Sequence, residues 1–229
     1  LRQYAGAALS CTPALQRFTS VRGDLTHKWR AAADSSSSAG AGDLSCDDLL
    51  AAAHGSVAII ECLGRLVSPL ARELRLNTDK LHRNMLASPT HSLRKMLEAE
   101  ACAGGTEAPE GSSALALLWL SRLLRLLERA LATTLHSPDR PFSDVIYKSY
   151  CETLKRHHDF ITQRLITAAV WAAPSRAEFL AKLGAGEPAA IEASIARMLT
   201  HMGSVLLHVR AVLESSGQPV EVEAPNTLQ

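Results

Sequence analysis

The sequence has almost no net charge and no apolar run long enough to cross a membrane. Its 24 lysines and arginines face 23 acidic residues, which leaves a formal charge of +1 over 229 residues. Proteins whose main partner is nucleic acid usually have a strongly basic domain, so this balance argues against such a partner. The longest purely apolar run covers residues 114–120, whereas a membrane-spanning helix needs roughly 20 apolar residues. Any contact with a membrane should therefore be peripheral.

Motifs for catalysis and for metal binding are also missing. The five cysteines are scattered and form no C-x-x-C pair, so the sequence indicates neither a zinc site nor a disulfide framework. Such usage suits a reducing compartment, and we expect the protein in the cytoplasm. No nucleophile motif or glycine-rich phosphate loop is present. We predict a protein that is not an enzyme and needs no cofactor or metal. The enzymatic alternative would use Glu73 and His158 as an acid–base pair.

The sequence is rich in helical patterns. Apolar residues make up 47% of the chain, enough to bury a sizeable core. Segments with proline, glycine and serine separate the patterns, and no alternating run of β-branched residues predicts a sheet. We predict an all-α fold of about eight helices. The four clearest helices are expected over residues 70–86, 113–135, 144–172 and 189–215.

Polar and aromatic residues in three of these helices occupy unusual positions. Glu73, Asn77 and Lys80 fall in a narrow arc beside the apolar stripe of the first helix, at about 100° per residue. Trp119 lies in the leucine-rich part of the second helix. The third helix places His158 in the middle of an apolar face. That face is expected to comprise Tyr150, Leu154, Ile161 and Leu165.

Both ends of the chain are predicted to lie outside the folded domain. Residues 1–43 are rich in alanine and serine, with several cations and few acids. Organelle transit peptides and disordered linkers share this composition, and we favour a disordered extension that ends in a flexible linker over 35–42. The domain is expected over 44–216, where Ser45 or Asp47 would cap its first helix. The remaining residues, 217–229, would form a tail.

Four segments of the sequence form an ordered set of motifs. The first is Glu61-Cys62-Leu63-Gly64 followed by Glu73-x-x-x-Asn77-x-x-Lys80-Leu81, and the second is the tryptophan segment over residues 114–122. The third is Tyr150-x-x-x-Leu154-x-x-x-His158, and the fourth is Ala172-Ala173-Pro174-x-x-x-x-Phe179-Leu180. In type, order and separation they resemble the glycolipid transfer protein family from about residue 44 to 215. The resemblance implies a two-layer helical sandwich that encloses the hydrocarbon chains of one sphingolipid in an apolar pocket.

The resemblance also implies a site for the lipid head group. Asn77 and Lys80 would hydrogen-bond the sugar, and Trp119 would stack on the sugar ring. His158 would bind the carbonyl of the ceramide amide, and the acid at position 73 would accept hydrogen bonds from the amide nitrogen and a sugar hydroxyl. The chemistry suits these roles, because a sugar offers hydroxyls and one apolar face. A buried amide group without a partner costs about 1–3 kcal/mol.

Three features depart from the family pattern. The usual acid at position 73 is aspartate, and the extra methylene of Glu73 moves the carboxylate outward by about 1.3 Å. Phe160 stands where the family often has a tryptophan that enters the membrane interface, so we expect Phe160 and Trp171 to share the docking role. The tail, over residues 220–225, lacks the aromatic ending with which some members close over the lipid amide.

The predicted function is the non-catalytic binding of one sphingolipid and its transfer between membranes. Trp119 favours a glycosylceramide, carried by a monomer that contacts membranes transiently. Within the same family the alternative is ceramide-1-phosphate, whose phosphate would need cations such as Lys80 and Arg122. Outside the transfer function, the chain could be a lipid sensor or a helical interaction module.

The same residues also have ordinary structural interpretations. A histidine or a tryptophan on an apolar helix face is commonly a core residue, and the arc from Glu73 to Lys80 could be a solvated face. Lys155, Arg156 and Arg164 could form a basic patch toward anionic lipids or could simply be solubilising charges.

Overall fold

The structure, a computed structural model, describes residues 25–37, 43–64, 67–88, 90–103, 111–184 and 186–217. Within those ranges all regular structure is helical, apart from an isolated antiparallel bridge between Ser45 and Ser92. The predicted all-α class is therefore confirmed. After a helical segment over 25–37, the elements are α2 Cys46–Cys62, α3 Ser68–Ala87, α4 Leu93–Ala103, α5 Ser113–His136, α6 Phe142–Thr153, the 3₁₀ helix η2 Lys155–His157, α7 Phe160–Trp171, α8 Arg176–Leu183 and α9 Pro188–Ser215.

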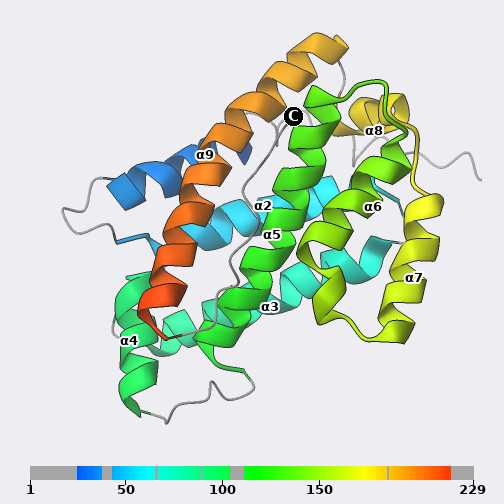
Figure 1. Cartoon of the computed structure of the whole chain (residues 1–229). Helices are drawn as coiled ribbons and strands as arrows, with labels where there is room; N and C mark the ends of the chain where they lie inside the picture. The colour runs from blue at the N-terminus through cyan, green and yellow to red at the C-terminus, as the bar shows by residue number, and fades with distance from the viewer. Residues whose placement is uncertain are drawn as a thin grey trace, which may run out of the picture.

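The helices form two layers. In Figure 1, α2 and α3 lie behind α5, α6 and α9 and run across them. Helix α5 lies at the centre and packs against α3, α6 and α9. Among the described helices, none has the length and hydropathy needed to cross a membrane.

The apolar faces of α2, α5 and α9 each contribute a large part of the core. Helix α9 buries the stripe that its periodicity predicts: Ile191, Ile195, Met198, Met202, Val205, Val209 and Val212. Helix α5 buries leucines on several sides, because it has neighbours on several sides. Each such side chain stabilises the fold by about 1.5–3 kcal/mol relative to an exposed one.

Side-chain caps fix the starts of several helices. Ser45 accepts a hydrogen bond from the Asp48 amide at 3.3 Å, which confirms it as the cap of α2. The Glu100 carboxylate of α4 accepts hydrogen bonds from the amide and the hydroxyl of Ser113. A carboxylate is favourable there because the first turn of α5 presents unpaired N–H groups. Helix α4 is thereby attached to the start of α5.

The disordered extension expected over residues 1–43 is wrong for residues 25–37. These residues are helical, and Leu25 and Trp29 are buried in the core. The indole N–H of Trp29 donates to the Ser56 hydroxyl of α2 at 3.2 Å. The linker expected over 35–42 begins inside this helix, where the Ser35 hydroxyl donates to the Ala32 carbonyl. Residues 1–24, 38–42 and 218–229 lie outside the described residues.

The continuous helix expected over residues 144–172 is also wrong. Helix α6 ends at Thr153, η2 follows, and His158 has extended backbone angles, φ −102° and ψ 141°. Asp159 then caps α7 by accepting a hydrogen bond from the Thr162 amide at 2.8 Å. A capping aspartate inside the apolar pattern was the missed signal. Because the helix breaks, Ile161 and Leu165 are 71% and 67% exposed rather than part of the core.

Candidate functional site

One face of α3 supplies three polar side chains at helical spacing. Asn77 is buried, and its amide nitrogen donates to the Glu73 carboxylate and to the Glu73 carbonyl, both at 2.9 Å. These two bonds fix the orientation of both side chains. Lys80 lies one turn further along the same helix and is partly buried. Within the described residues its ammonium group makes no hydrogen bond or ion pair, so it is available to a ligand.

The next position of the same arc has a structural role. Asn84 donates from its amide nitrogen to the Ser113 hydroxyl and to the Gly111 carbonyl, each at 3.0 Å. These bonds join the end of α3 to the start of α5. The polar face of α3 therefore changes along its length, from a candidate ligand surface at Glu73 and Asn77 to an interhelical contact at Asn84.

His158 lies in the turn between η2 and α7 and is held by a tyrosine of α6. The hydroxyl of Tyr150 lies 3.0 Å from Nδ1 of His158, and the Tyr150 side chain is buried. Burial raises the pKa of Tyr150 to about 12, so its hydroxyl keeps its proton at neutral pH. A phenol that donates to Nδ1 leaves the imidazole proton on Nε2, as a donor for a ligand.

The charge state of His158 follows from its surroundings. Burial lowers its pKa, and the Glu73 and Asp159 carboxylates partly offset that effect. The imidazole is therefore neutral at pH 7. The electrostatic interaction with Glu73 also means that the polar face of α3 and the turn after η2 face the same space.

Trp119 of α5 lies beside this histidine. Its ring is nearly parallel to the His158 ring, with centroids 6.2 Å apart and an interplanar angle of 10°. The His157 ring meets it at a steep angle of 77°, with a centroid distance of 6.0 Å. The Arg122 guanidinium lies 5.1 Å from the centroid of the indole. Trp119 is only partly buried, so part of its surface remains open to a ligand.

The structure thus brings four of the five expected head-group residues together. We call Glu73, Asn77, Trp119, Tyr150 and His158 the polar cluster; Lys80 borders it on α3. Tyr150 was named in the sequence motif only as part of an apolar face, and its role as the partner of His158 was missed. Tyr150 and His158 were expected on one continuous helix, where side chains eight residues apart do not touch. Their contact forms only because the chain leaves the helix between them.

The two expected membrane-docking residues lie at opposite ends of α7. Phe160 is 67% exposed and Trp171 is 66% exposed. Arg164, between them, places its guanidinium 4.9 Å from the centroid of the Phe160 ring. With the exposed Ile161 and Leu165, α7 presents large apolar side chains to the surroundings, which is typical of an interaction surface.

Comparison with known proteins adds independent information. Residues 44–185 match the family model described as glycolipid transfer protein. The chain is 35% identical over 135 residues to a glycolipid transfer protein of Danio rerio; the match covers 55% of this chain and 64% of that protein, slightly less than two thirds.

Solved structures show a similar fold. The crystal structure of HET-C2, a fungal glycolipid transfer protein, superposes with a TM-score of 0.70 at 26% identity and covers 78% of this chain and 90% of that one. Mouse ceramide-1-phosphate transfer protein gives a TM-score of 0.74 at 20% identity, covering 85% of this chain and 95% of that one. At that identity the second likeness shows the fold alone. Because the family model spans more than half of the sequence and includes every residue of the polar cluster, this chain belongs to the glycolipid transfer protein family.

Proposed function

We propose that this protein binds one sphingolipid, preferentially a glycosylceramide, and transfers it between membranes without catalysing a reaction. The observation that supports this most is the meeting of α3, α5 and the turn after η2 in one polar cluster beside an aromatic ring. Family membership supports the class of ligand. The arrangement within the cluster supports the choice of head group.

The ceramide amide would be bound by His158 and Glu73. The Nε2–H of a neutral His158, held by Tyr150, is a donor for the amide carbonyl. The Glu73 carboxylate has two oxygens and accepts one hydrogen bond from Asn77, which leaves acceptor positions for the amide N–H. Both polar groups of the amide would thus be paired when the lipid leaves water.

The sugar would be bound by Asn77, Lys80 and Trp119. The open part of the indole suits the apolar face of a sugar ring, while the amide and the ammonium group suit its hydroxyls. The hydrocarbon chains would provide most of the affinity by leaving water, at roughly 25 cal/mol per Å² of buried apolar surface. They would enter the apolar interior between the two helical layers.

Delivery would occur at a membrane surface through α7. Phe160 and Trp171, with Ile161 and Leu165 between them, can enter the interfacial region while Arg164 faces the lipid head groups. We also propose that the protein acts as a monomer in the cytoplasm and contacts membranes transiently. The scattered cysteines support that compartment.

The test is a transfer assay between phosphatidylcholine vesicles with fluorescent glucosylceramide and fluorescent ceramide-1-phosphate. We expect faster transfer of glucosylceramide, and we expect Trp119→Ala to slow it by roughly tenfold or more with unchanged helical circular dichroism. Trp119→Phe, which keeps a ring, is the matched control and should retain most of the activity. A folded wild-type protein that moves neither lipid would overturn the proposed function.

The second candidate is transfer of ceramide-1-phosphate. The observation that favours it is the Arg122 guanidinium over the Trp119 ring, which could bind a phosphate at that position. Faster transfer of ceramide-1-phosphate in the same assay would select this candidate. A protein that binds glucosylceramide but releases none to acceptor vesicles would instead be a lipid sensor.

A further inference from the structure

The turn that carries His158 lies between two helical elements and belongs to neither. Its backbone is extended, after the end of η2 at His157 and before the start of α7 at Phe160. A carbonyl in such a turn lies outside the helical hydrogen-bond ladders and needs a donor from elsewhere. The position of the imidazole in the polar cluster therefore depends on what holds this stretch of backbone.

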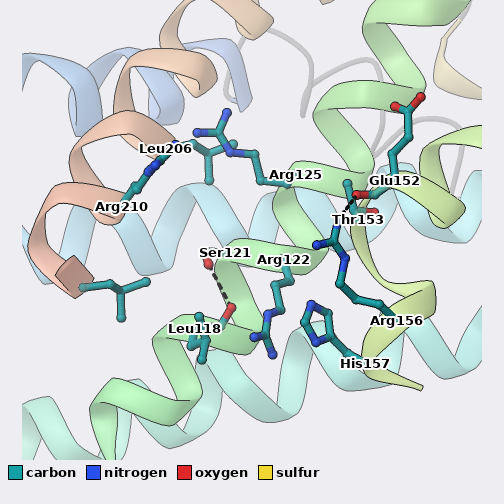
Figure 2. Close-up of a pocket in the computed structure, with 11 residues that line it drawn as sticks. Leu118, Ser121, Arg122, Arg125, Glu152, Thr153, Arg156, His157, Leu206 and Arg210 are labelled. Carbon is teal, nitrogen blue, oxygen red and sulfur yellow. Dashed lines mark hydrogen bonds between the residues drawn. The ribbon is translucent and has the colours of Figure 1, made fainter. Parts of the chain in front are cut away.

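Two neighbouring histidines contact the same indole from this stretch. The His158 ring lies nearly parallel to Trp119, and the His157 ring meets it at a steep angle. Figure 2 shows His157 beside Arg122 of α5, where both line a pocket, whereas His158 faces Tyr150. Because both rings lie against one indole, a change in this backbone would alter which imidazole a ligand meets.

One side chain of α7 holds this backbone at two points. The amide nitrogen of Gln163 donates to the Lys155 carbonyl at 2.9 Å and to the His158 carbonyl at 2.8 Å. Both partners are carbonyls, which can only accept, so the side chain must present its nitrogen to them and not its oxygen. A side-chain amide has two N–H hydrogens, and these two bonds use both.

The two carbonyls lie on either side of His157. The Lys155 carbonyl also accepts a hydrogen bond from the backbone N–H of His158 at 3.2 Å, which closes the turn of η2. Gln163 thus joins η2, the turn that follows it and the first turn of α7 into one unit. The Gln163 side chain is partly buried, so water competes less for these bonds than it would at an open surface.

Gln163 lies opposite the exposed apolar side chains in the middle of α7. At about 100° per residue, Ile161 and Leu165 each lie about 160° from Gln163 around the helix axis. Those two side chains are exposed, whereas Gln163 bonds to the turn. A substitution at Gln163 can therefore loosen the turn while it leaves the proposed docking surface unchanged.

We propose that Gln163 is a positioning residue for recognition of the ceramide amide, because it fixes the backbone so that His158 rather than His157 meets the amide carbonyl. This inference rests on the proposed function, in which Nε2–H of His158 is the donor. Tyr150 holds the imidazole ring, and Gln163 holds the backbone that carries the ring. Without Gln163, only a fraction of the molecules would present the donor correctly, and the apparent affinity would fall by that fraction.

The experiment replaces Gln163 by methionine and, separately, by glutamate. Methionine keeps the length and the helix preference of the side chain but has no N–H. Glutamate keeps the shape, but its ionised carboxylate would turn acceptor oxygens toward two carbonyls. The matched control is Thr167→Val, which removes a bond within α7 itself, from the Thr167 hydroxyl to the Gln163 carbonyl at 2.7 Å. Circular dichroism checks the fold of each variant.

Hydrogen exchange of the His158 backbone amide is measured first, in lipid-free protein. This N–H bonds to the Lys155 carbonyl, so its exchange rate reports opening of the turn. We expect Gln163→Met to accelerate the exchange by at least about fivefold, and Gln163→Glu to accelerate it further. Thr167→Val should exchange like the wild type. Equal rates in the wild type and both Gln163 variants would overturn the inference.

Affinity for a short-chain glucosylceramide is measured next, in solution without vesicles, so that membrane docking plays no part. We expect binding to Gln163→Met to be about two- to tenfold weaker than to the wild type, with a larger loss for Gln163→Glu. Thr167→Val should bind like the wild type. If Gln163 only filled space, methionine would bind the lipid as tightly as glutamine does.

A double-mutant cycle shows whether Gln163 acts through His158. His158→Phe keeps a ring beside Trp119 but has no N–H to donate. In this background we expect Gln163→Met to change the affinity by less than about 1.5-fold, because the two residues act as one unit. The same loss in both backgrounds would mean that Gln163 acts elsewhere, and the inference would be wrong.

The outcomes separate this inference from the proposed function. A wild type and a Gln163→Met variant that bind glucosylceramide equally well overturn the inference and leave the proposed function intact. A folded wild type that binds neither glucosylceramide nor ceramide-1-phosphate overturns the proposed function and, with it, the role of Gln163 at the ceramide amide.

Discussion

The Tyr150 hydroxyl lies 3.0 Å from Nδ1 of His158, and by donating a hydrogen bond there it leaves the imidazole proton on Nε2. Tyr150 is buried in α6, whereas His158 lies in the turn before α7. The phenol keeps its proton because burial raises its pKa to about 12. In the proposed site Tyr150 is therefore a positioning residue, which would act on the lipid through His158.

Replacing Tyr150 by phenylalanine should weaken lipid binding while keeping the ring in the core. A neutral hydrogen bond contributes about 0.5–1.5 kcal/mol, so we expect affinity to fall by roughly two- to tenfold. Binding is measured with a fluorescent glucosylceramide. Nitrogen NMR of the imidazole should show a shift from the Nε2–H form to a mixture of tautomers.

Tyr147→Phe is the matched control for that variant. Tyr147 lies on the same helix, and its hydroxyl accepts a hydrogen bond from the Lys155 ammonium at 3.4 Å, away from His158. This variant should leave the tautomer of His158 unchanged. Equal tautomer shifts in both variants would contradict the positioning role of Tyr150.

The stability of the protein should fall as the pH is lowered below 6.5. Burial holds the pKa of the folded His158 below its ordinary value of 6.5. Between 6.5 and that lowered pKa, the unfolded chain takes up a proton that the folded chain does not, so the free energy of unfolding decreases. Below the folded pKa both states are protonated and this contribution levels off. Urea unfolding at several pH values, with His158→Gln as reference, isolates the effect; identical pH profiles would exclude it.

Asn77→Asp should destabilise the fold at neutral pH. The substitution removes a donor at 2.9 Å from the Glu73 carboxylate and puts a carboxylate in its place at a buried position. We expect a loss of at least about 2 kcal/mol in the free energy of unfolding, measured by chemical denaturation.

Adding Glu73→Gln to Asn77→Asp restores a donor and an acceptor between the two positions. We expect the double variant to recover more than half of the lost stability, because neighbouring residues in one hydrogen-bond network are coupled. The single variant Glu73→Gln completes the double-mutant cycle. If the stability lost in the double variant equals the sum of the losses in the two single variants, the Glu73–Asn77 hydrogen bond contributes nothing to stability.

Removing the exposed aromatic residues of α7 should slow delivery without changing binding. Phe160→Ala with Trp171→Ala takes away two large side chains that are each about two-thirds exposed, at 67% and 66%. Burying such a side chain contributes about 1.5–3 kcal/mol, so vesicle adsorption should fall by roughly tenfold or more. Affinity for a short-chain lipid in solution should stay the same.

Leu207→Ala is the control for α7. Leu207 is 63% exposed but lies on α9. If this variant reduced vesicle adsorption as strongly as the α7 variant, the docking surface would not be specific to α7.

Trp29→Ala should show whether the segment over 25–37 is part of the domain. Trp29 is completely buried and its indole donates to Ser56, so we expect a loss of about 3–5 kcal/mol. The melting temperature is the measurement. The exposed Trp171 gives the matched comparison, and Trp171→Ala should change the melting temperature little. Equal small effects would mean that residues 25–37 are dispensable.

Several elements could be predicted because their signal is local. The apolar stripe of α9 repeats at three and four residues along a single helix, and one apolar face is enough to identify it. Ser45 as a cap follows from one side chain and the amides that follow it. The arc from Glu73 to Lys80 lies within α3, so helical geometry alone places its members together.

Other features depended on contacts between distant segments. The helix over 25–37 was not predicted, because its alanines and serines resemble those of a disordered linker. Packing on α2 through Trp29 stabilises this helix. Arg122 of α5 and Arg210 of α9 line one pocket, and no sequence spacing relates them.

The sequence by itself determined the helical class, the residue types of the candidate site and the family to which the chain belongs, because periodicity and motifs are properties of single segments. The tertiary structure decided how those residues are arranged. It placed His158 in the turn before α7 and against Tyr150, exposed the apolar side chains of α7, and placed Arg122 and His157 against the Trp119 ring. Such relations depend on the packing of separate elements, which the periodicity of any one of them does not contain.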